Sequence, residues 1–153
     1  MKKFVALLLA VLMVASLCAC GQKDTGSDLQ TVTKGKLTMS TNAQFPPYES
    51  VADDGKGYEG TGFEGIDIEI AYALAQKLGL ELVVDDMDFD SALSAVQTGK
   101  SDIVAAGVTV TPERQNTMSF TDSYANGVQV VIVKEGSDIK SIDDLEGKKI
   151  GTQ

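Results

Sequence analysis

The sequence predicts an α/β fold, because short apolar strands alternate with amphipathic helices along the folded part of the chain. Residues 65–79 (GIDIEIAYALAQKLG) have acidic residues in the first turn and a glycine at the end, which is typical of a helix. The apolar positions of this helix recur every fourth residue, at Ile66, Ile70, Leu74 and Leu78. Residues 102–107 (DIVAAG) form a short apolar run, which predicts a strand that is buried on both faces.

The elements before the main helix follow from alternation and from proline. Residues 36–41 (KLTMST) predict a strand, with Leu37 and Met39 on one side. Residues 42–48 (NAQFPPY) predict a loop, because two prolines exclude a helix and a central strand. The acidic, glycine-rich residues 49–62 are expected to form a solvated turn.

The elements after the main helix continue the alternation. Residues 80–84 predict a second strand, and Asp90 is expected to cap a helix that ends at Gly99. Leu93 and Val96 are expected to face inward from that helix. The remaining expected elements are a short helix opened by Thr111 and Pro112, a strand at 127–133 (GVQVVIV), a short helix at 141–145 and the start of a strand at 149–151. A chain that stops just after a strand begins predicts a fragment of a longer protein.

The composition excludes several kinds of function. The chain of 153 residues has no histidine, which excludes Ser-His-Asp and Cys-His catalytic units, His-ligated zinc and imidazole catalysis. There are 13 basic and 22 acidic residues, a formal net charge of -9, and this excess of acid argues against nucleic acid as a partner. No cofactor and no metal ion are expected.

Residues 1–19 predict a signal peptide rather than part of the fold. Lys2 and Lys3 precede a run of apolar residues that is too short for a comfortable transmembrane helix. Residues 17–20 (LCAC) then resemble the lipobox of bacterial lipoproteins, which predicts lipidation of Cys20 and a flexible tether over residues 20–34. The alternative is an ordinary secretory peptide with two incidental cysteines. We therefore expect an exported protein, anchored by lipid to the outer face of the cytoplasmic membrane.

Arg114 is the single arginine and the first candidate binding residue. It lies in the first turn of a predicted helix, close to the positive N-terminal end of the helix dipole. A cation is unfavourable there, so an anion is expected to bind between the helix end and the guanidinium. The planar guanidinium suits a carboxylate, because its fork can bond both oxygens. The alternative is a surface ion pair with Glu113 or another nearby acid.

Further candidates lie where predicted strands end. Residues 106–109 (AGVT) join a strand to the helix of Arg114, and this edge of an open α/β sheet is the usual ligand crevice. Phe45 and Phe89 each follow a strand and would flank the same edge, although each Phe taken alone is more often a core residue. A carboxylate clamp, acceptors for an ammonium group and two aromatic walls together predict a site for a free α-amino acid.

Several motifs in a fixed order resemble the family 3 bacterial extracellular solute-binding proteins, the polar-amino-acid receptors of ABC importers. The resemblance covers residues 36–153 and rests on GIDIEI at 65–70, TNAQFPPY at 41–48, MDF at 87–89, AGVTVT at 106–111, Arg114, FTDSY at 120–124 and DDLEGK at 143–148. It implies a periplasmic-binding-protein-like (type II) fold of two α/β lobes that close on ligand. Residues 35–126 would form lobe one, incomplete without its C-terminal return, and residues 127–153 the hinge crossing and the start of lobe two.

The resemblance also implies roles for individual residues. Arg114 would hold the ligand α-carboxylate with help from Thr109, while the Ala106 carbonyl and Gly107 would serve the α-ammonium. Phe45 and Phe89 would sandwich the ligand. The remaining expected contacts are Asn42, near the ligand side chain, and Gln153, where the second lobe begins to contact ligand.

The function expected from this resemblance is that of a substrate-binding lipoprotein, not an enzyme. It would capture a free, polar amino acid and deliver it to the permease subunits of an ABC importer. The alternatives are an enzyme on the same scaffold, such as a dehydratase or a transglycosylase-associated module, and the sensor ectodomain of a receptor kinase. The acidic residues are expected mainly at helix caps and turns, which argues against a catalytic acid.

Overall fold

The computed structural model describes residues 29–151, in two separate units. The first unit ends at Phe120 and the second begins at Thr121. The signal peptide, Cys20 and Gln153 lie outside the described residues, so the predictions made for them stay predictions. The proposed lobe boundary between residues 126 and 127 also stays a prediction.

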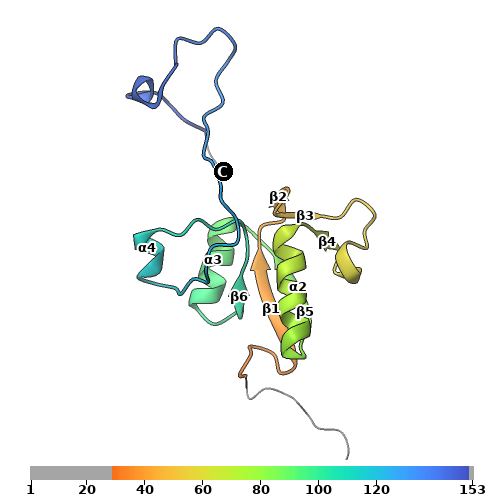
Figure 1. Cartoon of the computed structure of the whole chain (residues 1–153). Coiled ribbons are helices and arrows are strands. Elements are labelled where there is room, and N and C mark those ends of the chain that lie inside the picture. The colour runs from red at the N-terminus through yellow and green to blue at the C-terminus, as the bar shows by residue number, and fades with distance from the viewer. Residues whose placement is uncertain (1–28, 152–153) are drawn as a thin grey trace, which may run out of the picture. The chain divides into compact units, whose positions relative to one another are not determined.

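The first unit is built on a parallel sheet with the strand order β5-β1-β6 (Figure 1). Its strands are β1 (Lys36–Thr41), β5 (Glu81–Asp86) and β6 (Ile103–Val104). Thr41 pairs with Asp86 at one end of β1, and Met39 pairs with Ile103 on its other side. Because all three strands are parallel, their carboxyl ends meet at one edge of the sheet.

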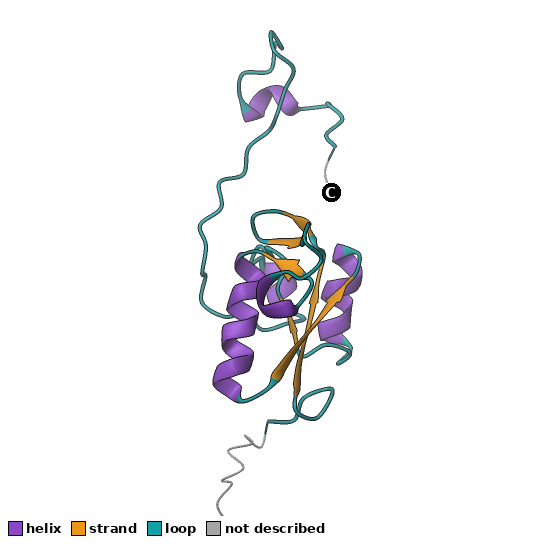
Figure 2. Cartoon of the chain, turned by 90° about the vertical axis from the view of Figure 1, so that its right-hand side faces the viewer, coloured by secondary structure: helices purple, strands orange, loops and turns teal. Residues whose placement is uncertain are grey.

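Two helices cover opposite faces of this sheet (Figure 2). The helix α2 (Ile66–Leu78) connects β1 to β5, and α3 (Phe89–Gln97) connects β5 to β6. The first connection runs from the central strand β1 to β5, and the second runs back from β5 past β1 to β6, so right-handed crossovers place their helices on opposite faces. The mixed α/β class predicted from the sequence is confirmed.

The buried face of α2 differs from the prediction. Ile68, Ala71 and Ala75 are at most 1% exposed, and Ile68 and Ala71 form the core with Met39 of β1. The side chains of Ile66, Ile70 and Leu74 are instead 38–43% exposed. The helix is apolar on two faces, and the face with alanines lies against the sheet because small side chains permit close approach. The predicted stop at Gly79 is confirmed by its left-handed C-cap conformation.

A small antiparallel sheet with the order β2-β3-β4 stands beside the main sheet. It contains β2 (Gln44–Phe45), β3 (Glu49–Val51) and β4 (Phe63–Glu64), and a short helix, η1 (Tyr58–Gly60), precedes β4. The prediction of a solvated turn over residues 49–62 was therefore partly wrong. Glu49 is only 1% exposed, and backbone pairing with the flanking segments removes this end of the stretch from solvent.

The helix α3 and the strand β6 also differ in detail from the predictions. Asp88, not Asp90, occupies the N-cap position of α3, and Asp90 lies in the first turn. Ala92 and Ala95 form its buried face, while Leu93 and Val96 are only half-buried. The strand β6 has two half-buried residues, because within the described chain it pairs with β1 alone. The prediction of a strand buried on both faces was wrong.

The last helix of the first unit is α4 (Pro112–Gln115). Thr111 caps it, accepting a hydrogen bond from the backbone N–H of Arg114 at 3.2 Å, and Pro112 is its first residue. The predicted cap is confirmed.

The second unit has one short helix, η2 (Ile142–Leu145), and no strand within its described residues. Ser141 and Asp144 form a capping box there, which confirms the helix predicted at 141–145. The strands predicted at 127–133 and 149–151 are not formed. Val128 and Ile132 are 85% and 93% exposed, and an apolar segment without a partner strand cannot satisfy its backbone as a strand does.

Candidate functional site

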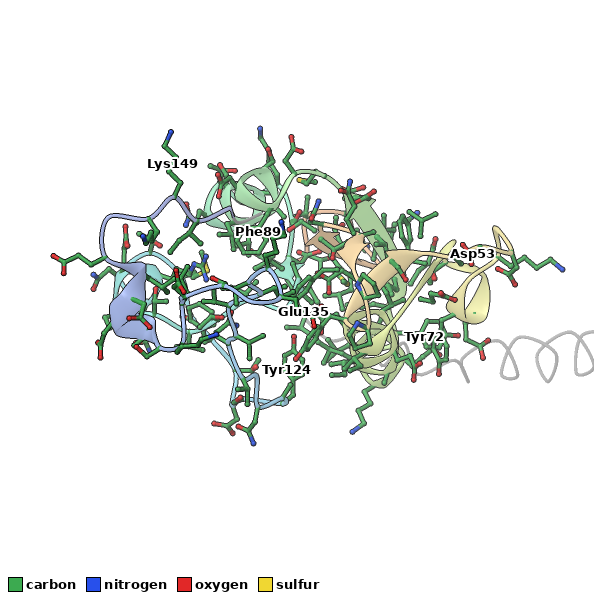
Figure 3. All side chains as sticks on the ribbon, turned by 90° about the horizontal axis from the view of Figure 1, so that it is seen from above. Asp53, Tyr72, Phe89, Tyr124, Glu135 and Lys149 are labelled. Atoms are coloured by element: carbon green, nitrogen blue, oxygen red, sulfur yellow. The ribbon has the colours of Figure 1, made fainter. Side chains whose placement is uncertain are left out.

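The candidate site lies at the carboxyl edge of the parallel sheet, as the sequence predicted. Asn42 directly follows β1, Phe89 follows β5 by three residues, and the 106–109 turn follows β6. All of these residues belong to the first unit. Figure 3 shows the side chains of the described residues from above and labels Phe89.

Arg114 is held by two of the predicted site residues. Its guanidinium carbon lies 5.4 Å from the centroid of the Phe89 ring, and its Nη1 donates a hydrogen bond to the Thr109 carbonyl at 2.9 Å. The cation–π contact and the hydrogen bond together orient the planar group. The guanidinium has five N–H donors, so donors remain for a carboxylate in the plane of the fork.

The physical reason that the sequence suggested for Arg114 needs correction. The helix α4 has only four residues, so Arg114 lies in its first and its last turn at once. A single turn has a small dipole, and Arg114 meets no strong field from it. The Phe89 ring and the Thr109 carbonyl, rather than the helix end, define where this cation points.

Gly107 forms a second part of the site, together with Phe45 and Tyr48. The Phe45 and Tyr48 rings are stacked, with centroids 5.5 Å apart and an interplanar angle of 8°. Gly107 has a φ of 52°, and a Cβ added there would lie 3.0 Å from Cε1 of Phe45. The turn therefore needs glycine both for its left-handed backbone and for the close approach of the Phe45 ring.

Asn42 and Ala106 are the most enclosed of the predicted contacts. Asn42 is 6% exposed and its Nδ2 donates a hydrogen bond to the Met87 carbonyl at 3.0 Å. This bond ties the end of β1 to the segment between β5 and α3. Ala106 is 3% exposed, so this residue is almost completely shielded from solvent.

The structure adds two acidic residues that the sequence reasoning did not single out. Asp67 is fully buried, and its Oδ2 accepts a hydrogen bond from the Gly107 N–H at 2.7 Å. Glu49 is buried beside it, and burial together with the negative charge of Asp67 and a side-chain hydrogen bond raises the pKa of Glu49 to about 9. The sequence predicted that acidic residues lie mainly at helix caps and turns. Glu49 and Asp67 are exceptions, because both are buried.

A signal for Asp67 was present in the sequence. It lies next to Ile68 and one turn before Ala71, on the face of α2 that packs inward. An acidic side chain that faces inward needs a buried hydrogen-bond partner. It is therefore a candidate for a role in binding or for a structural hydrogen bond. The four-residue spacing of the larger apolar residues predicts burial of the other face of the helix.

Between residues 29 and 151, no helix is both long and apolar enough to cross a membrane. Over the same residues, no group of three or more acidic or cysteine side chains is arranged to hold a metal ion.

The chain was compared with known families and proteins. The model of the bacterial extracellular solute-binding proteins, family 3, matches residues 37–148. The chain belongs to this family. The resemblance read from the motifs is therefore confirmed, and so is the type II periplasmic-binding-protein-like fold, of which the described residues form a part.

The family 3 relatives include the arginine-binding extracellular protein ArtP of Bacillus subtilis (strain 168), which is 39% identical over the whole chain and 56% of its own length. Among solved structures, an ancestral arginine-binding protein bound to arginine is 42% identical, with a TM-score of 0.64 over 74% of this chain and 48% of that one. An ancestral arginine-binding protein bound to glutamine is 41% identical, with the same TM-score over 75% and 49%. The chain spans about half the length of the curated relatives it matches.

Proposed function

We propose that this family 3 protein binds a free α-amino acid and presents it to the permease of an ABC importer. The observation that carries the proposal is the placement of Arg114 by Phe89 and Thr109 at the carboxyl edge of the sheet. An oriented guanidinium beside an aromatic face suits the carboxylate of a small zwitterion.

The two ends of the ligand would be bound by different parts of the edge. Arg114 would bond the α-carboxylate with the donors that it does not give to Thr109. The backbone of Ala106 and Gly107 would accept hydrogen bonds from the α-ammonium, with the Phe45 and Phe89 rings as walls. Asn42 and, from the second lobe, Gln153 would contact the ligand side chain.

Arginine is the ligand that we propose first. ArtP is named as an arginine-binding protein, and the ancestral relatives were solved with arginine and with glutamine. A formal net charge of -9 also attracts a cationic ligand over a distance. Closure of the lobes would be driven by the greater affinity of the closed form for ligand.

The protein would act by binding and not by catalysis. The acid with a raised pKa, Glu49, is 1% exposed, so a bound ligand would not reach it as a general acid. Export and lipid attachment at Cys20 would hold the receptor close to its permease.

The experiment is a binding screen on the complete protein, by thermal shift and then isothermal titration calorimetry against arginine, histidine, lysine, glutamine and cystine. We expect one of these to bind with 1:1 stoichiometry and to be recovered unchanged by mass spectrometry. A complete, folded protein that binds no free amino acid would overturn the proposal. Conversion of the ligand into product would instead support the enzyme alternative.

A further inference from the structure

Two buried acidic side chains lie behind the 106–109 turn, outside the set of predicted ligand contacts. Glu49 begins β3, directly opposite Phe45 in the small sheet, and Asp67 is the second residue of α2. They are 1% and 0% exposed. Water is excluded from both carboxyl groups. Hydrogen bonds within the protein must therefore offset the free-energy cost of burying them.

The backbone around Asp67 is built to hold its side chain in one place. The Asp67 N–H donates to the Tyr48 carbonyl at 2.9 Å, and the neighbouring Ile66 N–H donates to the Pro47 carbonyl at 3.1 Å. Gly65 permits this approach, because a Cβ there would lie 2.3 Å from the Tyr48 carbonyl oxygen. The start of α2 is therefore fastened to the segment that carries Phe45 and Tyr48.

From this position, the Asp67 carboxylate reaches the ligand turn. Its Oδ2 accepts the Gly107 N–H at 2.7 Å, a short distance for an N–H donor and typical of a charge-assisted hydrogen bond. The N–H of Gly107 and the carbonyl of Ala106 belong to the same peptide unit. In a trans peptide these two groups point in opposite directions, so a bond to the N–H also sets the direction of the carbonyl.

We propose that Asp67 is a positioning residue for ammonium recognition, which orients and polarises the peptide between Ala106 and Gly107, with Glu49 as its buried hydrogen-bonding partner. This inference rests on the proposed function, which assigns that part of the backbone to the ligand α-ammonium. A peptide whose N–H is bonded to a carboxylate has a stronger carbonyl acceptor, because consecutive hydrogen bonds polarise one another.

The charge of Asp67 favours ammonium binding at this turn, as does the orientation of the peptide. Burial, together with the negative charge of Asp67, raises the pKa of Glu49 to about 9, so the Glu49 carboxyl stays protonated at neutral pH beside the negative charge of Asp67. That charge lies behind the turn that faces the ammonium, whereas the cation of Arg114 is bonded to Thr109, two residues further along the chain. The two ends of the site therefore have opposite charges that match those of a zwitterion.

The test compares an amino acid with its desamino analogue, which has the same carboxylate and side chain but no ammonium group. Calorimetry on the complete protein gives the ratio of the two affinities for the wild type and for Asp67→Asn. The asparagine keeps the size and an acceptor oxygen but removes the charge. We expect the ratio of the affinity for the amino acid to that for the analogue to be at least about fivefold lower in Asp67→Asn than in the wild type. The affinity for the analogue itself should change little.

A matched control is Glu69→Gln, which removes an exposed charge from the same first turn of α2 and should leave the ratio unchanged. A second measurement does not depend on binding. The amide proton of Gly107 should move upfield in the NMR spectrum of ligand-free Asp67→Asn, because its acceptor is weaker.

The outcomes separate this inference from the proposed function. If the wild type binds no amino acid, the proposed function fails. If the wild type binds and Asp67→Asn keeps the full ratio, or weakens both ligands equally, Asp67 has no positioning role for the ammonium and the inference is overturned. If Asp67→Asn unfolds, the smaller Asp67→Ser variant is measured for the same ratio, which should fall because the Gly107 N–H loses its carboxylate acceptor.

Discussion

The guanidinium carbon of Arg114 lies 5.4 Å from the centroid of the Phe89 ring, although the two residues are 25 positions apart in the chain. This contact joins the segment after β5 to the segment after β6, at the edge where ligands bind in open α/β sheets. A guanidinium held over an aromatic face still has N–H donors that it can give to an anion.

The fork of Arg114 is predicted to be as important as its charge. Arg114→Lys keeps a cation but loses bidentate bonding, and we expect the affinity for the amino acid to fall at least about tenfold, or about 1.4 kcal/mol. Calorimetry on the complete protein measures this. The control is Lys77→Ala, at an exposed position in the last turn of α2, and an unchanged affinity in Arg114→Lys would contradict the carboxylate assignment.

The ring of Phe89 is predicted to support binding through Arg114. Phe89→Leu keeps an apolar side chain but loses the cation–π contact, which is worth about 0.5–2 kcal/mol, or roughly a 2- to 30-fold loss of affinity. Tyr58→Leu is the matched control, because it removes an aromatic contact to Tyr72 elsewhere on the first unit. Equal affinities for the wild type and Phe89→Leu would show that the ring does not orient the guanidinium.

Gly107 is predicted to be needed for two separable reasons, which a pair of variants distinguishes. Gly79→Ala introduces a side chain at a φ of 69° with nothing within 4 Å, so it measures the left-handed strain alone, about 1 kcal/mol. Gly107→Ala adds the contact with Phe45 to that strain. We expect urea unfolding to show a loss of stability in both variants and calorimetry to show a loss of affinity only in Gly107→Ala.

The buried Glu49 is predicted to make stability depend on pH. Its pKa is raised from 4.5 in the unfolded chain to about 9 in the folded protein, so its contribution is fully present below pH 4.5 and is lost as pH rises to about 9. The slope is at most about 1.4 kcal/mol per pH unit. Urea unfolding at pH 5, 7 and 9 should show this fall in the wild type and a flatter profile in Glu49→Gln. Parallel profiles would mean that Glu49 is ionised in the folded protein.

The lipid anchor is predicted to depend on Cys20, the first residue after the predicted signal peptide, and not on Cys18 within it. Cys20→Ala should release the protein from the membrane fraction of expressing bacteria, and labelling with a radioactive fatty acid should be lost. Cys18→Ala is the control, because alanine is also a small residue at a position where the lipobox requires one. If Cys20→Ala stays with the membranes, the lipobox interpretation is wrong.

Much of the fold was predictable because it depends on local signals. The strand at 36–41, the glycine stop of α2 and the Thr111-Pro112 start of α4 each follow from the residues that form them. The prediction of a strand at 127–133 was wrong, because a strand depends on residues that are distant in the chain as well as on its own sequence. Its apolar sequence is compatible with a strand, but a strand also needs a partner, and in the described chain that segment has none.

The amino-acid sequence by itself determined the α/β class, and it predicted the candidate edge with Arg114, Phe45 and Phe89. Periodicity, composition and capping are properties of neighbours in the chain, so they need no knowledge of contacts. Only the tertiary structure decided which face of α2 is buried, and that Asp67 bonds Gly107 beside a protonated Glu49. Those outcomes depend on which surfaces meet and on how far water is excluded, and residues 18 and 40 positions apart are brought together only by folding.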